Sequence, residues 1–289
     1  MATKEFTHLH VHTEYSMLDG AARLGDLFTH AKELGMKSMA TSDHGFLFGA
    51  FDFWRQAKAH DIKPIIGVEA YLTPGTHRTD RSRVRWGDGS RDDVSGGGAY
   101  THMTMWAETT EGMHNLFRAS SIASLEGQLY KPRMDREVLQ TYSKGLIATT
   151  GCPSGEIQTR LRLGQFDEAI QAASDFRDIF GKDNFYCEVM DHGLDIERNV
   201  QEDLHRLAKQ LNLPYVATND LHYTRQEDHT AHAALLCVQS GSTLTDPKRF
   251  KFDADNFYLR SPEEMYSIFG DIPGACENTL EIAERCNVE

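Results

Sequence analysis

The stretch that decides the fold is residues 6–20, Phe6-Thr7-His8-Leu9-His10-Val11-His12-Thr13-Glu14-Tyr15-Ser16-Met17-Leu18-Asp19-Gly20. Residues 6–12 have the pattern of a β-strand, and Asp19-Gly20 predicts a turn after it. Side chains two residues apart on a strand point the same way, so His10 and His12 are expected to project together from its carboxyl end. A bound metal needs such a pair, although an isolated His-x-His more often has no metal.

Strand patterns recur along the rest of the 289-residue chain. We expect six more strands, at residues 37–42, 64–71, 99–107, 145–150, 184–190 and 214–218, with helical patterns between them, such as 24–34 and 47–60. Seven strands in βα alternation predict an α/β fold with a parallel sheet and the helices outside. The residues alone allow either an open doubly wound sheet or a closed (β/α) barrel. No nucleotide-binding glycine motif follows any of the strands.

The domain organisation follows from changes in composition. Residues 1–240 carry the strands and are expected to form one barrel domain, and the glycine-rich stretch 73–98 is expected to be an inserted mobile loop. Residues 241–289 predict a helical connecting segment, with two short helices near 261–269 and 274–286.

Charge and cysteine content limit the possible functions. The chain has 30 Lys and Arg against 43 Asp and Glu, a formal charge of −13, so it should repel nucleic acid unless local patches or bound cations reverse the sign. Five scattered cysteines without a C-x-x-C pair indicate reduced thiols and a cytoplasmic location rather than a disulfide framework. No secretory signal and no long apolar run is present, so no membrane partner is expected.

Metal-ligand residues lie at or near the ends of successive expected strands. Besides His10 and His12, they are Asp19, His44, Glu69, His102, Cys152, Asp220 and His222. In a (β/α) barrel the carboxyl ends of the strands meet on one face, where active sites form. Each residue alone has an ordinary explanation: Cys152 as a small buried side chain, and Asp43-His44-Gly45 as a turn. Together they exceed what one four-coordinate zinc uses, but they suit three metals that share ligands.

Six motifs resemble one known family. They are the stretch from His8 to Gly20, Thr41-Ser42-Asp43-His44-Gly45, Gly67-Val68-Glu69-Ala70-Tyr71, His102-Met103-Thr104, Gly151-Cys152-Pro153-Ser154-Gly155-Glu156-Ile157 and Ala217-Thr218-Asn219-Asp220-Leu221-His222-Tyr223. In this order they resemble the PHP (polymerase and histidinol phosphatase) domain. The likeness is strongest to the N-terminal PHP domains of bacterial DNA polymerase III alpha subunits, the C-family replicative polymerases. It implies a distorted, TIM-like (β/α)7 barrel with a trinuclear metal site.

The resemblance also implies a ligand set. His10, His12, Glu69 and Asp220 would hold one metal, and Glu69 would bridge to a second held with His102 and Cys152. Asp19, His44 and His222 would hold the third. The imidazoles and the thiol favour zinc, whereas the carboxylates also suit manganese or magnesium.

The function that the resemblance implies is metal-dependent phosphodiester hydrolysis, as a 3′→5′ exonuclease that proofreads a single-stranded or frayed primer end. Two alternatives remain: a metal-stabilised scaffold without activity, and a small-molecule phosphomonoesterase of the histidinol-phosphatase type. The expected partners are DNA, the rest of a DNA-directed DNA polymerase chain that continues into a palm domain after residue 289, and, through it, replisome components such as the sliding clamp.

The stretch 73–98 carries the main basic cluster that suggests DNA contact, and Lys131-Pro132-Arg133 is a weaker second patch. The cations of the stretch 73–98 are Arg78, Arg81, Arg83, Arg85 and Arg91, and Trp86 lies among them. We expect the arginines to contact the DNA backbone and Trp86 to stack on a base. A purely solvated loop is the alternative.

Overall fold

The computed structural model describes residues 4–90 and 93–289. The helices are α1 (Leu24–Glu33), α2 (Ala50–Ala59), α3 (Ser95–Gly98), α4 (Thr110–Glu126), α5 (Arg136–Tyr142), α6 (Glu156–Arg162), α7 (Phe166–Phe180), α8 (Asp195–Leu211), α9 (His229–Ser240), α10 (Pro262–Phe269) and α11 (Glu277–Arg285). The strands are β1 (Ser38–Thr41), β2 (Lys63–Leu72), β3 (Thr101–Ala107), β4 (Arg133–Met134), β5 (Leu146–Thr149), β6 (Phe185–Val189) and β7 (Tyr215–Ala217). Among these residues, no helix is long and apolar enough to cross a bilayer.

The strands form a curled sheet in the order β1-β2-β3-β5-β6-β7, with β4 paired to β2. The α/β fold and six of the predicted strands are confirmed. The prediction of an all-parallel sheet is wrong for β3, which pairs antiparallel with both β2 and β5. A parallel pair needs a crossover connection, usually a full helix, and between β2 and β3 the described residues form only the four-residue α3.

The stretch at residues 8–12 closes the ring. The predicted strand at 6–12 is not regular, but it forms isolated parallel bridges from His8 to Met39 on one side and from Val11 to Leu221 on the other. Hydrogen bonds from Ala40 N to the His8 carbonyl (2.9 Å) and from His12 N to the Leu221 carbonyl (2.7 Å) tie it to both edges. The barrel is therefore closed, in the distorted form that the resemblance implies.

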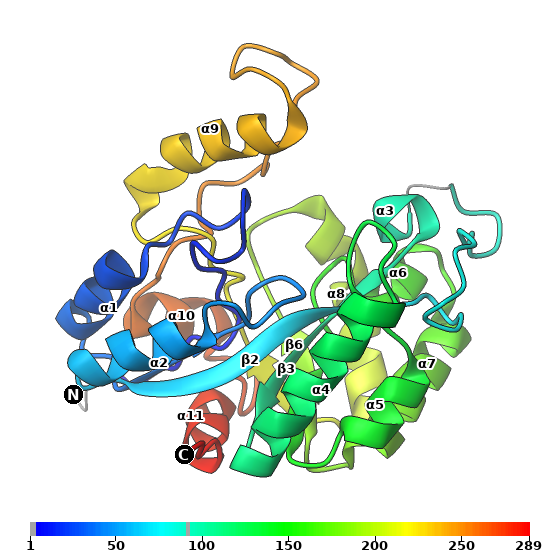
Figure 1. Cartoon of the computed structure of the whole chain (residues 1–289), viewed down its shortest axis with the longest axis horizontal. Coiled ribbons are helices and arrows are strands. Elements are labelled where there is room, and N and C mark those ends of the chain that lie inside the picture. The colour runs from blue at the N-terminus through cyan, green and yellow to red at the C-terminus, as the bar shows by residue number, and fades with distance from the viewer. Residues whose placement is uncertain (1–3, 91–92) are drawn as a thin grey trace.

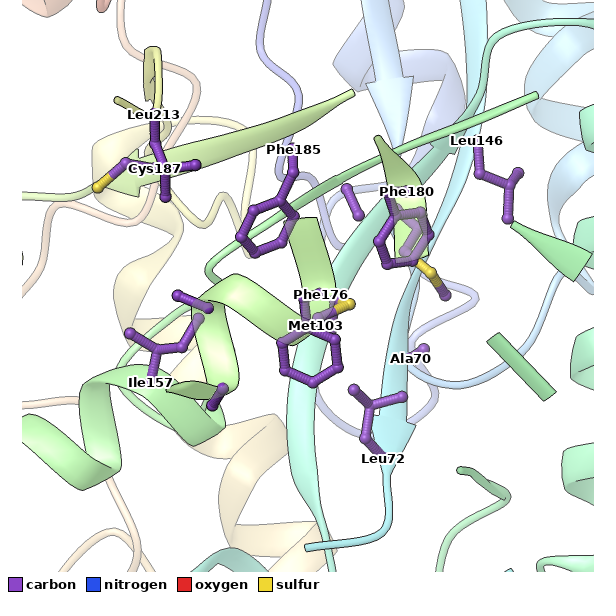
Figure 2. Packing of buried hydrophobic residues seen from close by; sticks show 14 of the residues in the cluster. Ala70, Leu72, Met103, Leu146, Ile157, Phe176, Phe180, Phe185, Cys187 and Leu213 are labelled. Carbon is purple, nitrogen blue, oxygen red and sulfur yellow. The ribbon is translucent and has the colours of Figure 1, made fainter. Parts of the chain in front are cut away.

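Helices cover the barrel in two groups (Figure 1). On one side, α1 and α2 pack on an apolar cluster that includes Leu27, Phe28 and Phe53. On the other side, α4 to α8 cover a larger cluster, where the rings of Phe176, Phe180 and Phe185 lie against the strands (Figure 2). The leucine, phenylalanine and alanine spacing that predicts residues 24–34 as a helix matches the buried face of α1.

The segment after residue 240 shares the core of the barrel. The two predicted short helices are confirmed as α10 and α11. Ile282 of α11 and Cys286 directly after it pack with Leu9, Ile65 and other side chains in a third apolar cluster. The segment thus contributes to the barrel rather than only following it.

A buried arginine helps to attach the insertion to the barrel. Arg133 is 1% exposed. Its guanidinium donates to the carbonyls of Gly127 (2.9 Å), Ala99 (3.1 Å), Arg78 (3.0 Å) and Asp80 (2.8 Å). The loop therefore has a fixed anchor, and its mobility stays a prediction.

Candidate metal centre

Glu69, near the carboxyl end of β2, lies at the centre of the site and is 2% exposed. Its Oε1 atom is 2.9 Å from His102 Nδ1 and 3.2 Å from Cys152 Sγ. Its Oε2 atom is 2.6 Å from His44 Nδ1. One carboxylate therefore reaches two separate groups of ligand atoms, as a bridging ligand must.

His10 and His12 approach the same centre from the closing stretch. The Nε2 atoms of His10 and His12 lie 3.3 and 3.1 Å from Asp220 Oδ1. They lie 3.5 and 3.7 Å from the oxygens of Glu69. Asp220 adopts φ of +43°, a left-handed conformation that is costly for a residue with a side chain and that occurs most often at functional sites.

A third group contains Asp19, His44 and His222. His44 Nε2 is 2.8 Å from Asp19 Oδ2. The ring of His12 lies 4.1 Å from that of His44 and 4.3 Å from that of His222, between centroids. All nine predicted ligands thus gather in one place, which we call the cup.

His102 was expected near the carboxyl end of its strand, but it reaches the cup from the amino end. It lies at the start of β3, not at a carboxyl end. Because β3 runs antiparallel to β2 and β5, its amino end lies at the rim where the parallel strands finish. The reversed strand therefore supplies a ligand to the same face of the barrel.

Several buried atoms in the cup lie close to other polar groups but form no well-aligned hydrogen bond. They are His10 Nε2, His12 Nε2, Asp19 Oδ1, His44 Nδ1 and Glu69 Oε2. Unpaired buried polar atoms are costly, so their concentration in one cup indicates a ligand that they bind together. Imidazole, carboxylate and thiol atoms are the donors that divalent metals take, and the side chains therefore fit metal ions.

The electrostatics of the cup point the same way. Burial disfavours charge on Glu69, yet His102 and His44 hold its pKa well below the usual range. Burial likewise opposes the charged form of His44, but Glu69 and Asp19 raise its pKa to about 10. Burial, together with the neighbouring His44 and His222, lowers the pKa of His12 to about 3. The ionised carboxylates of the cup therefore favour positive charge beside them, on His44 here, as a cation-binding environment does.

Comparison with known proteins places the chain in a family. A PHP domain profile matches residues 8–192, which include seven of the nine cup residues. The chain belongs to the PHP domain family. Among the relatives of this PHP domain is the DNA polymerase III subunit alpha of Saccharopolyspora erythraea, 58% identical over 295 residues. That of Mycobacterium tuberculosis is 55% identical over 288 residues.

The alignments cover 99% and 98% of this chain but only 25% and 24% of the two relatives. The chain therefore spans about a quarter of the length of the curated relatives it matches. Among solved structures, an amidohydrolase from Chromobacterium violaceum, with bound sulfate and no metal, aligns with a TM-score of 0.43 and 13% identity. That alignment covers 75% of this chain and 87% of the other, and the likeness is too distant to add to the argument.

Glu188 holds His10 of the cup of this PHP domain in position, and the sequence analysis did not predict this role. This carboxylate on β6 is fully buried and accepts hydrogen bonds from His10 Nδ1 (2.7 Å), Thr149 Oγ1 (2.5 Å) and Thr218 Oγ1 (2.7 Å). The bond at Nδ1 leaves His10 Nε2 facing the cup. A carboxylate behind a metal-binding histidine fixes the ring and raises its basicity. A glutamate inside a strand pattern that is otherwise apolar was the signal available in the sequence.

Asp43 is a second residue that the sequence pattern did not identify as part of the site. It accepts hydrogen bonds from Thr13 N (2.7 Å) and Ser16 Oγ (2.7 Å). Ser16 Oγ in turn lies 3.1 Å from His12 Nδ1. Asp43 thus orients the His12 ring through Ser16, and it does more than form the turn considered from the sequence.

The predicted DNA-contacting residues of the insertion differ in whether they are exposed or already paired. Arg78 forms ion pairs with Glu126 (2.6 Å), Asp135 (3.1 Å) and Glu137 (3.0 Å), so its charge is already neutralised. Trp86 is 6% exposed, and the Arg160 guanidinium lies 3.8 Å from its ring centroid, which counts against the expected stacking on a base. Arg81, Arg83 and Arg85 are exposed, and Arg91 lies outside the described residues.

Proposed function

We propose that the chain is a metal-dependent phosphodiesterase that removes nucleotides from the 3′ end of DNA. The observation that carries the proposal is the convergence of nine ligand side chains, several with unpaired buried atoms, at one end of the barrel. Divalent ions bound there would polarise the phosphodiester and lower the pKa of a coordinated water. We expect three ions, with zinc first and manganese or magnesium as alternatives.

The chain's own residues would hold these ions in the grouping that the distances favour. His10, His12 and Asp220 form one group of mutually close ligand atoms, and His44, Glu69 and His102 form another. Glu69 reaches both, and Asp19 reaches the second through His44. Burial raises the pKa of the Cys152 thiol, and the nearby Glu69 raises it further, so only a bound cation would keep this sulfur as a thiolate.

The likeness to DNA polymerase III alpha subunits supports DNA as the substrate. We propose that the chain works as a proofreading domain of a longer replicative polymerase, with the rest of that polymerase and the sliding clamp as partners. Exposed Arg81, Arg83 and Arg85 are the residues of the insertion that remain available for the DNA backbone. A cytoplasmic location is the corresponding prediction.

Hydrolysis of a 3′-labelled single-stranded oligonucleotide tests the proposal. We expect the metal-loaded chain to shorten the strand from its 3′ end. A chelator, Asp19→Asn and His10→Ala should each abolish this activity. The matched control is His229→Ala, because His229 is exposed and lies outside the cup.

The alternatives predict different results in the same assay. Turnover of a phosphomonoester without any loss of DNA would indicate the phosphatase. Bound metal with no hydrolysis of either substrate would indicate the scaffold, and either result would overturn the proposal.

A further inference from the structure

A cavity of about 700 Å³ opens directly beside the cup. Cys152 and Asp220 of the cup line one part of it. The opposite wall comes from the start of α8 and from the segment after α9, and includes Ile196, Phe250 and Phe252. The cavity therefore joins the metal-binding end of the barrel to a wall of apolar side chains.

Two side chains of this wall remain open to solvent. Phe250 is 54% exposed and Ile196 is 40% exposed. A single exposed apolar side chain is ordinary on a protein surface, but here two lie in one cavity beside a polar cup. A flat apolar ligand would cover both.

The aromatic wall is continuous with the cup. The Phe252 ring lies 4.8 Å from the ring of His222 and 6.1 Å from the ring of Phe250, between centroids. A ligand that places a phosphate in the cup therefore has an aromatic surface within reach of its next chemical group.

The acidic groups that face the cavity are already paired. Asp253 lies 2.9 Å from Lys251 Nζ, and Asp195 lies 3.7 Å from an Arg198 guanidinium nitrogen. Glu197 accepts hydrogen bonds from the ring and the backbone N–H of His192, at 2.6 and 2.7 Å. An anionic ligand therefore meets no unpaired carboxylate on this wall.

We infer that this cavity is a subsite for the base of the 3′-terminal nucleotide, with Phe250 as the ring on which the base stacks. The inference rests on the proposed function, because it assumes that the cup holds the phosphate of the same nucleotide. Stacking on an aromatic side chain accepts every base, which suits removal of any mispaired nucleotide. A sugar phosphate without a base would have no aromatic ring to place there.

Binding is tested with a single-stranded oligonucleotide that ends in 2-aminopurine, whose fluorescence is quenched by stacking. The host is the 289-residue Asp19→Asn chain with zinc, in which the strand should stay intact. We expect quenching that is lost with Phe250→Ala and Phe250→Leu and kept with Phe250→Tyr. Phe51→Ala is the matched control, because Phe51 is 74% exposed but lies on α2, outside this cavity. Equal quenching in all variants, or none in the host, would overturn the inference.

Hydrolysis gives the second readout. The otherwise unmodified chain should cleave a normal 3′ end faster than the same strand with an abasic 3′ end. The expected ratio in kcat/KM is roughly 5- to 150-fold, which corresponds to the ~1–3 kcal/mol of one base stack. Phe250→Ala should remove this ratio. Cleavage of both ends at equal rates would refute the subsite and leave the phosphodiesterase standing, whereas quenching without any cleavage would refute the phosphodiesterase and support the subsite.

Discussion

Individual side chains in this PHP domain are oriented by partners that are not themselves ligands. Glu188 fixes His10 through Nδ1, and Asp43 fixes His12 through Ser16. Both arrangements leave an Nε2 atom in the cup that forms no hydrogen bond. The candidate ligands are thus set in place by the protein alone, which would lower the cost of ordering them around a metal.

Glu188→Gln should weaken zinc binding by about 10- to 100-fold, because His10 loses the negative charge that raises its basicity. Competition against a fluorescent zinc chelator measures this affinity. The matched control is Glu197→Gln, since Glu197 is also a buried partner of a histidine, His192, but does not contact a cup residue through it. Unchanged affinity in Glu188→Gln would show that the carboxylate serves only the fold.

The sequence predicted the candidate ligands better than it predicted the residues that orient them. All nine ligands could be named because histidine, carboxylate and cysteine at strand ends are distinctive and match a known set of motifs. Glu188 and Asp43 could not be named, because their role depends on contacts with residues that are distant in the sequence.

Among the elements, β2 and β3 decide the geometry of the site, since they carry Glu69 and His102. They pair closely in the region of Gly67, where an added Cβ would lie 2.4 Å from the Met105 carbonyl oxygen. The strand can therefore accept only glycine there without moving its neighbour. The reversal of β3 could not be predicted, because a strand pattern carries no direction. The sequence of the long insertion at 73–98 also did not reveal that its described residues form only the short α3.

Gly67→Ala should lower the free energy of unfolding by about 1–3 kcal/mol, because the new methyl group collides with backbone that cannot move away cheaply. Urea denaturation followed by circular dichroism provides the measurement. The control is Gly25→Ala in α1, where nothing lies within 4 Å of the added Cβ. There we expect no loss and a gain of up to about 1 kcal/mol from helix propensity. Equal effects at the two positions would contradict the close approach of β2 and β3.

For the whole molecule, the central feature is the charge distribution. The chain has a formal charge of −13, and Asp19, Glu69 and Asp220 add local negative charge in the cup. Bound divalent ions would make the local charge of the cup positive. This would offset the repulsion of nucleic acid that the composition predicts. Ring closure and the packing of α11 could not be read from the sequence, because they depend on contacts between distant segments.

Metal removal should destabilise the whole barrel. Zinc at 100 times its dissociation constant would add about 2.7 kcal/mol per site, and each kcal/mol raises Tm by roughly 2–4 °C. We therefore expect a chelator to lower Tm by at least roughly 5 °C in the unaltered chain, and by less in His10→Ala, which loses one of the three proposed sites. Differential scanning calorimetry provides the measurement. Equal responses of the two proteins would place the stabilising metal outside the cup.

The most direct test of the central claim is anomalous X-ray scattering at the zinc edge from crystals of the zinc-loaded chain. The account predicts three peaks inside the cup, each within bonding distance of the ligands proposed for it and roughly 3.5–4 Å from its neighbour. A cup without peaks, or peaks only at the separate group formed by His77, Asp135 and Glu137, would contradict it.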